Sequence, residues 1–111
     1  MKAFHELLTN LGGDWDEART VIAIFFDSAG EQLDTLQAAV DEGNREQLAN
    51  AAHQLAGATG TCGLTALCDQ LRGLENDAST AELTDLRDRI HVVAADINRL
   101  QTEWSLESHS P

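Results

Sequence analysis

The sequence predicts an all-α fold, an up-down antiparallel four-helix bundle with a short additional helix at the N-terminus. Apolar residues recur three and four positions apart along the chain, and no useful length alternates apolar with polar residues. A single Pro and no Tyr are also compatible with helix. The 111 residues correspond to one domain, 1–111, with a folded core over 3–104 and a frayed tail expected over 105–111.

Two helices are expected in the first part of the chain. A short helix carries Phe4, Leu7, Leu8 and Leu11, and Gly12-Gly13 ends it. Asp14 begins a long helix, with Glu17 in the capping-box position, and Gly43-Asn44 ends that helix. The apolar stripe of the long helix is Ala18, Val21, Ile22, Phe25, Ala29, Leu33, Leu36 and Val40.

Three further helices complete the predicted bundle. The third begins near Asn44, and Gly63 ends or bends it; its buried stripe is Leu48, Ala51, Ala52, Leu55, Thr59 and Cys62. The fourth ends around Asn76-Asp77; its stripe is Leu64, Leu67, Cys68, Leu71 and Leu74. Ser79 and Glu82 predict a capping box for the last helix, whose stripe is Leu83, Leu86, Ile90, Val93, Ile97, Leu100 and Trp104. Short connections make consecutive helices antiparallel.

Charge and composition exclude several classes of partner. A formal net charge of −12 leaves no basic patch for nucleic acid and disfavours an anionic membrane surface. No apolar run is long enough to span a membrane and the N-terminus does not resemble a signal peptide, so we expect a soluble, cytoplasmic domain that binds other proteins.

Cys62 and Cys68 match no metal or redox spacing and are expected to be buried thiols. No ligand pairs indicate a metal site, and we expect no cofactor.

The segment from Ala51 to Gly63 contains the candidate site. At 100° per residue, His53 lies opposite the buried stripe and points into solvent. Its neighbours on that side are all small: Ala49, Ala56, Gly57 and Gly60. A glycine within a helix costs about 1 kcal/mol relative to Ala, so this surface is best explained by close approach of another molecule to the backbone. An exposed imidazole on a rigid helix can act as a nucleophile. The alternative is a surface histidine without function, on a helix whose small residues only permit packing.

The run His53-Gln54-Leu55-Ala56-Gly57-Ala58-Thr59-Gly60-Thr61-Cys62-Gly63 resembles the signature of histidine-containing phosphotransfer (HPt) domains, H-x-L-K-G-(S/A)-(S/A)-x-x-x-G. Leu11-Gly12-Gly13-Asp14 is similar to the turn that opens their second helix, and Leu67-Cys68-Asp69-Gln70-Leu71 to their fourth-helix pattern. The resemblance covers roughly residues 3–104.

The resemblance implies a phosphocarrier of a two-component phosphorelay rather than an enzyme. His53 would carry a phosphoryl group between receiver-domain aspartates, Gly57 would let the partner approach, and Gly63 would close the helix. The implied partners are receiver (response regulator) domains, which would supply Mg²⁺ and an acidic pocket, and a hybrid sensor histidine kinase. The domain itself is expected to be a monomer.

One position departs from the family pattern. The family commonly has Lys three residues after the histidine, where it is thought to steady the phosphoryl group; this chain has Ala56, and its only Lys is Lys2. Without that charge-assisted contact, phosphohistidine could be shorter-lived. Arg45 or Arg72 could substitute from the nearby surface. The alternative is a degenerate HPt-like adaptor that docks receiver or kinase domains without stable phosphorylation. A helical adaptor with no phosphochemistry at all is a further hypothesis.

Two apolar residues lie off the stripe of the long second helix. Ile24 and Phe26 are at opposite flanks of it. They are expected to pack against the short first helix or, alternatively, to form part of a receiver-binding patch.

Overall fold

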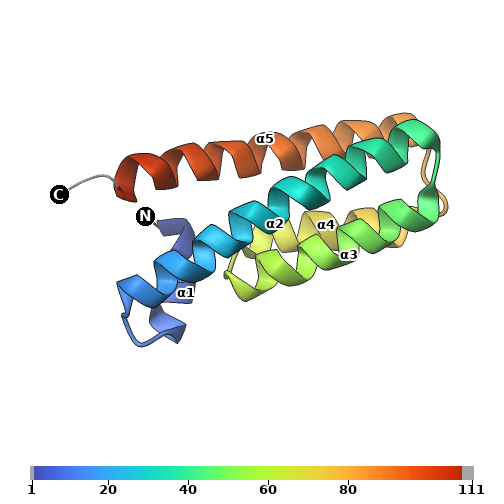
Figure 1. The fold of residues 1–111 in the computed structure, drawn as a ribbon. Coiled ribbons are helices and arrows are strands. Elements are labelled where there is room, and N and C mark those ends of the chain that lie inside the picture. The colour runs from blue at the N-terminus through green and yellow to red at the C-terminus, as the bar shows by residue number, and fades with distance from the viewer. Residues whose placement is uncertain (1, 109–111) are drawn as a thin grey trace.

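The computed structural model describes residues 2–108 and is helical nearly throughout, with no strand in that range. A short 3-10 helix, η1 (Lys2–Phe4), leads into α1 (His5–Asn10), followed by α2 (Trp15–Glu42), α3 (Arg45–Thr61), α4 (Thr65–Asp77) and α5 (Leu83–Ser108). The helices α2 to α5 run alternately up and down, side by side, and α1 lies at the end of the bundle where α2 begins (Figure 1). The predicted all-α bundle with a short additional N-terminal helix is confirmed.

The boundaries of α2 and the start of α3 are fixed by the residues that the sequence indicated. The Asp14 carboxylate accepts hydrogen bonds from the Asp16 and Glu17 backbone N–H groups, which have no partner within the helix. Gly43 adopts the left-handed conformation, with φ of 70°, and the N–H of Asn44 donates to the Ala39 carbonyl at 2.8 Å. The Asn44 side chain then accepts from Gln47 N–H and caps α3.

Gly63 makes the tight turn between α3 and α4. Its φ is 73°, and the N–H of Leu64 donates to the Thr59 carbonyl at 2.9 Å. A Cβ at this position would lie only 3.0 Å from the Cβ of Glu6. The turn therefore needs Gly for its backbone conformation and for the close approach of α1.

The N-terminal segment fills the end of the bundle beyond the shorter helices α3 and α4. Phe4 is 1% exposed and packs edge-on against Phe26 of α2 and Trp104 of α5, with ring centroids 6.0 and 5.7 Å apart. Phe26 thus packs against the N-terminal segment, as one of the two alternatives predicted. Ile24 does not, and its side chain is 64% exposed.

The predicted capping box at Ser79 and Glu82 is wrong, because α5 begins only at Leu83. Ser79 lies in a turn. The guanidinium of Arg45, on α3, donates to the carbonyls of Ala78 and Ala81 at 2.9 and 2.7 Å. This contact between distant segments stabilises residues 78–81 as a loop, and no local pattern could have indicated it.

The expectation of a frayed tail over 105–111 is wrong for residues 105–108, because α5 continues to Ser108. Residues 109–111 lie outside the described range. Trp104 stacks on Trp15 with centroids 6.2 Å apart, which holds the end of α5 against the start of α2. Backbone hydrogen bonds then continue the helix for another turn without an apolar stripe.

Candidate functional site

His53 stands clear of the core on α3, with 73% of its side chain exposed to solvent. The buried side of the same helix consists of Leu48, Ala51, Ala52, Leu55, Ala56 and Thr59. The orientation predicted from helical periodicity is therefore the observed one. The imidazole is accessible to another protein while its backbone belongs to a packed helix.

The four small neighbours of His53 differ in their exposure to solvent. Gly57 and Gly60 are exposed, Ala49 is half-buried, and Ala56 is only 3% exposed. The expectation that Ala56 lies on the open surface is wrong, because it lies about 60° around the helix from His53 on the side that packs against α4. A Cβ at Gly57 would meet no atom within 4 Å, and one at Gly60 would meet only Cys68 Sγ at 3.5 Å. We call the exposed backbone at Gly57 and Gly60 the glycine surface.

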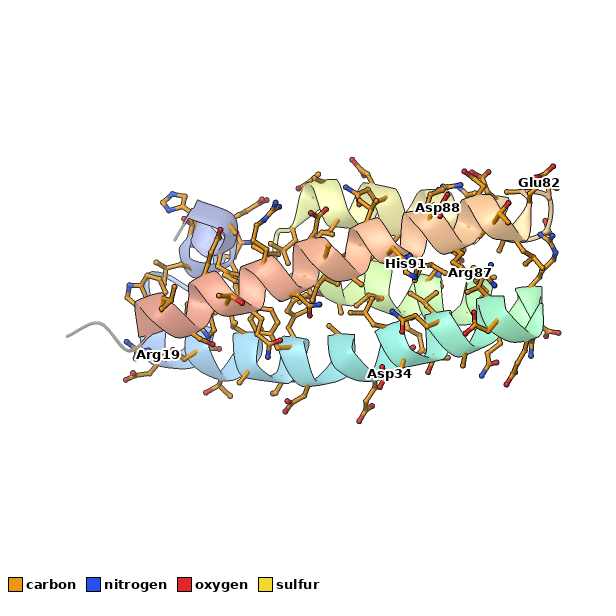
Figure 2. All side chains as sticks on the ribbon, turned by 90° about the horizontal axis from the view of Figure 1, so that it is seen from above. Arg19, Asp34, Glu82, Arg87, Asp88 and His91 are labelled. Carbon is orange, nitrogen blue, oxygen red and sulfur yellow. The ribbon has the colours of Figure 1, made fainter. Side chains whose placement is uncertain are left out.

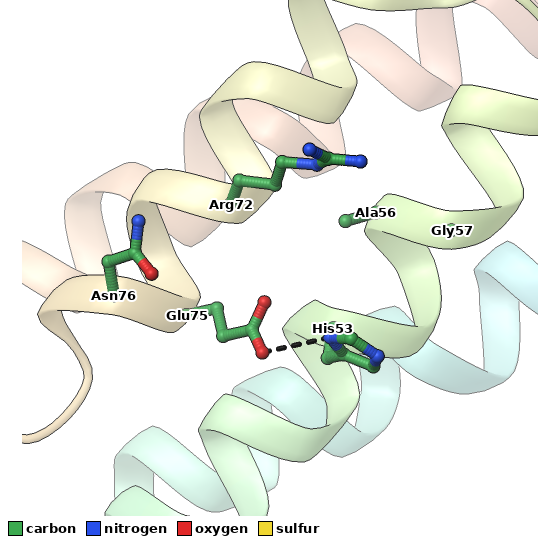
Figure 3. A pocket seen from close by; sticks show the side chains of 6 residues that line it. All are labelled: His53, Ala56, Gly57, Arg72, Glu75 and Asn76. Atoms are coloured by element: carbon green, nitrogen blue, oxygen red, sulfur yellow. Dashed lines mark hydrogen bonds and ion pairs between the residues drawn. The ribbon is translucent and has the colours of Figure 1, made fainter.

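Glu75 of α4 contacts the ring of His53 directly. Its Oε2 lies 2.9 Å from His53 Nδ1, and its side chain is 33% exposed (Figure 3). An ionised carboxylate can only accept a hydrogen bond, so Nδ1 carries the proton in this contact. In the neutral ring the lone pair is then on Nε2, the nitrogen turned away from Glu75. The pair therefore leaves Nε2 as the ring nitrogen with a free lone pair.

A pocket of about 470 Å³ opens between α3 and α4 beside this pair. Its α3 side is His53, Ala56 and Gly57, and its α4 side is Arg72, Glu75 and Asn76 (Figure 3). Both sets have the i, i+3, i+4 spacing that places residues on one helix face. The pocket therefore combines a wall of small residues and an imidazole with a wall of polar and charged groups.

Glu75 and Asn76 were not among the site residues predicted from the sequence. Their spacing with Arg72 on one face of the fourth helix was a usable signal. However, that spacing alone does not indicate which helix this face packs against, or which residues of that helix lie opposite it. Only the pairing of α3 with α4 places Glu75 opposite His53.

The two arginines considered as substitutes for the missing Lys are far from equivalent. The Arg45 guanidinium donates hydrogen bonds to the carbonyls of Ala78 and Ala81, and Arg45 does not line the pocket. Arg72 lines it.

The other residues considered for function, which are potential metal ligands, the two cysteines and His91, do not line this pocket. Among the described residues, no group of three or more His, Cys, Asp or Glu side chains could hold a metal ion. Both cysteines are free and buried, and burial raises the pKa of the Cys62 thiol to about 11. His91 is exposed on α5, on the side of the bundle where α5 and α2 lie next to each other (Figure 2). No helix in the described range is both long and apolar enough to span a membrane.

Comparison with known families identifies the fold. The chain matches the model of the Hpt domain over residues 20–103, more than half of its length. The chain belongs to the Hpt domain family. No curated protein and no solved structure gave a significant match. Hpt domains are phosphocarrier modules rather than enzymes: they serve histidine phosphotransfer in two-component signalling and interact with receiver and kinase domains.

Proposed function

We propose that this Hpt domain carries a phosphoryl group on Nε2 of His53 between the aspartates of receiver domains. The observation that carries the proposal is the exposed ring of His53 with its Nδ1 at 2.9 Å from Glu75. This contact leaves Nε2 as the free nucleophilic nitrogen on an accessible surface. The receiver would supply the Mg²⁺ and the acidic pocket, and a hybrid sensor histidine kinase would be the upstream source.

The transfer step follows from this arrangement. The Nε2 lone pair attacks the phosphorus of an aspartyl phosphate, a P–N bond forms, and the P–O bond to the aspartate breaks with its electron pair remaining on the carboxylate. The ring keeps its Nδ1 proton and gains positive charge as the bond forms. The Glu75 carboxylate, which accepts a hydrogen bond from that nitrogen, stabilises the charge. Attack on the phosphorus by a second receiver's aspartate reverses these changes.

The glycine surface explains how a receiver could reach His53. In-line transfer needs the attacking nitrogen close to the phosphorus, so the two proteins must approach at backbone distance. Gly57 lies one turn from His53 and has open space where a side chain would be. Replacement of Gly57 by Phe should therefore block transfer while leaving the core intact.

Ile24 is a second element of the proposed docking surface. Gln32 of α2 donates a hydrogen bond to Gln54 of α3 at 2.8 Å, which aligns the two antiparallel helices beside His53. Ile24 lies two turns before Gln32, level with the Gly60 end of α3. Its 64% exposure leaves apolar area at the same end of the α2–α3 pair as Gly60.

The proposal is tested with a receiver phosphorylated on its aspartate and mixed with wild-type domain, His53→Gln or His91→Gln. His91 is the matched control, an exposed histidine on a different face (Figure 2). Label should appear on wild type and His91→Gln as an acid-labile, base-stable phosphate and be absent from His53→Gln. Equal labelling of the His53→Gln variant would refute the proposal.

A second candidate function is favoured by one observation, the absence of a Lys at position 56. The domain would then be an adaptor that docks receiver or kinase domains without stable phosphorylation. Measured binding of a receiver to wild type and His53→Gln alike, with no label on either, would support the adaptor over the phosphocarrier.

A further inference from the structure

Arg72 differs from the other described arginines in having no partner. Each of the remaining five makes a hydrogen bond or ion pair: Arg19 with Asp16, Arg45 with two carbonyls, Arg87 with Asp41, Arg89 with Asp77, and Arg99 with Asp96. Arg72 is exposed, lines the His53 pocket, and forms no ion pair with Glu75 one turn away. Its guanidinium is therefore free to bind a ligand that enters the pocket.

The position of Arg72 is set by the antiparallel pairing of α3 and α4. His53 lies opposite Glu75. One turn further along α3 is Ala56, and one turn back along α4 is Arg72, so these two also face each other. Figure 3 shows the Arg72 side chain extending from α4 toward Ala56. The Ala56 methyl group is small and buried, and the other α3 residues that line the pocket are His53 and Gly57, so no α3 side chain other than His53 reaches far into this space.

A cation in the pocket would offset the negative charge that a phosphoryl group on His53 brings. A phosphoryl group adds about −1.5 to −2 charges at neutral pH. It would do so next to the Glu75 carboxylate, on a chain whose formal net charge is already −12. A guanidinium offers several N–H donors in a planar fork that fits phosphate oxygens. Arg72 is the cationic side chain that lines this pocket.

We propose that Arg72 binds the phosphoryl group of phosphorylated His53, so that α4 supplies the cation which a Lys at position 56 would supply from α3. The ligand is the phosphoryl group of N-phosphohistidine. The inference rests on the proposed function, because it requires that His53 is phosphorylated. It also explains why an Ala at position 56 is compatible with a phosphocarrier.

The test measures the lifetime of phosphohistidine in the isolated domain. Phosphoramidate serves as a small phosphodonor, and ³¹P NMR follows the decay, in which water attacks the phosphorus and the P–N bond breaks with its electron pair returning to Nε2. Arg72→Ala should shorten the lifetime roughly fivefold to tenfold, and Arg72→Lys should restore part of it. Arg19→Ala, an exposed arginine at the far end of α2, is the matched control and should match wild type (Figure 2).

Two further readouts separate phosphate binding from a general structural role. The ¹⁵N signal of the Arg72 Nε–H should move when His53 is phosphorylated, whereas that of Arg19 should not. Ala56→Lys placed in the Arg72→Ala background should lengthen the lifetime again, because the cation then comes from α3. Thermal unfolding shows whether each variant is folded, and if the double variant is not, Arg72→Lys provides the rescue.

The outcomes distinguish this inference from the function on which it rests. If His53 is labelled but Arg72→Ala decays within twofold of wild type and the Arg72 signal does not move, Arg72 is not the phosphate ligand and the phosphocarrier proposal stands. If wild type takes no label on His53 from either phosphoramidate or a receiver, both proposals fail.

Discussion

Replacing Glu75 by Gln should slow phosphorylation of His53 about fivefold while leaving the fold unchanged. The Gln side chain keeps an oxygen that can accept the Nδ1–H hydrogen bond but removes the negative charge. Replacement by Ala removes both. The pair of variants therefore separates the electrostatic contribution of Glu75 from its control of the tautomer.

The magnitude follows from the distance and exposure of the pair. Two unit charges at about 4 Å interact by about 1 kcal/mol in water and about 4 kcal/mol at an effective dielectric constant of 20. The Nδ1–Oε2 distance is 2.9 Å, but the imidazole is 73% exposed, which places the interaction near the aqueous limit. About 1 kcal/mol of lost stabilisation of the charged ring corresponds to about a fivefold lower rate. Glu75→Ala should lose about tenfold or more, because the tautomer is no longer fixed.

The assay is the initial rate of label transfer from a phosphorylated receiver at saturating receiver concentration. Glu31→Gln, at an exposed glutamate on α2, is the matched control for loss of one negative charge. The ¹⁵N spectrum of the His53 ring reports the tautomer independently of activity. Wild type and Glu75→Gln should show the Nδ1–H form, and Glu75→Ala should shift toward the Nε2–H form.

Unchanged rates and an unchanged tautomer in Glu75→Ala would refute this reasoning. That result would mean that the contact with Glu75 has no part in preparing the nucleophile. A slow Glu75→Gln variant with a normal tautomer, in contrast, would assign the effect to charge.

Three other predictions concern stability. Because burial raises the pKa of Cys62 from 9.0 to about 11, this group favours the folded state fully below pH 9. Between pH 9 and 11 its contribution should fall by about 1.4 kcal/mol per pH unit, and urea unfolding of Cys62→Ala should lack that slope. Gly57→Ala should raise the free energy of unfolding by about 0.5–1 kcal/mol, since the added methyl group meets no atom; a lower melting temperature would contradict this. Arg45→Ala should lower it by about 1–2 kcal/mol through loss of the bonds to Ala78 and Ala81, with labelling of His53 unchanged. Loss of labelling in the folded variant would show that Arg45 serves the site after all.

Local sequence signals predicted the elements of this fold because their physical causes are local. Helical hydrogen bonds link residues four apart, so the apolar stripes, the Asp14 cap and the left-handed Gly43 could be recognised without knowing any neighbour. The same periodicity predicted that His53 points into solvent. Where a distant group intervened, as Arg45 does at residues 78–81, the local prediction of the capping box at Ser79 failed.

The sequence by itself determined an all-helical bundle, the helix that carries His53 and the exposed side of that helix. Only the tertiary structure decided that Glu75 meets Nδ1, that Ala56 is buried, and that Arg72 rather than Arg45 lines the pocket. The physical reason is that periodicity fixes the direction of a side chain relative to its own helix axis. The height and rotation at which two helices meet depend on how all their side chains pack together, and these two quantities place α4 against the histidine.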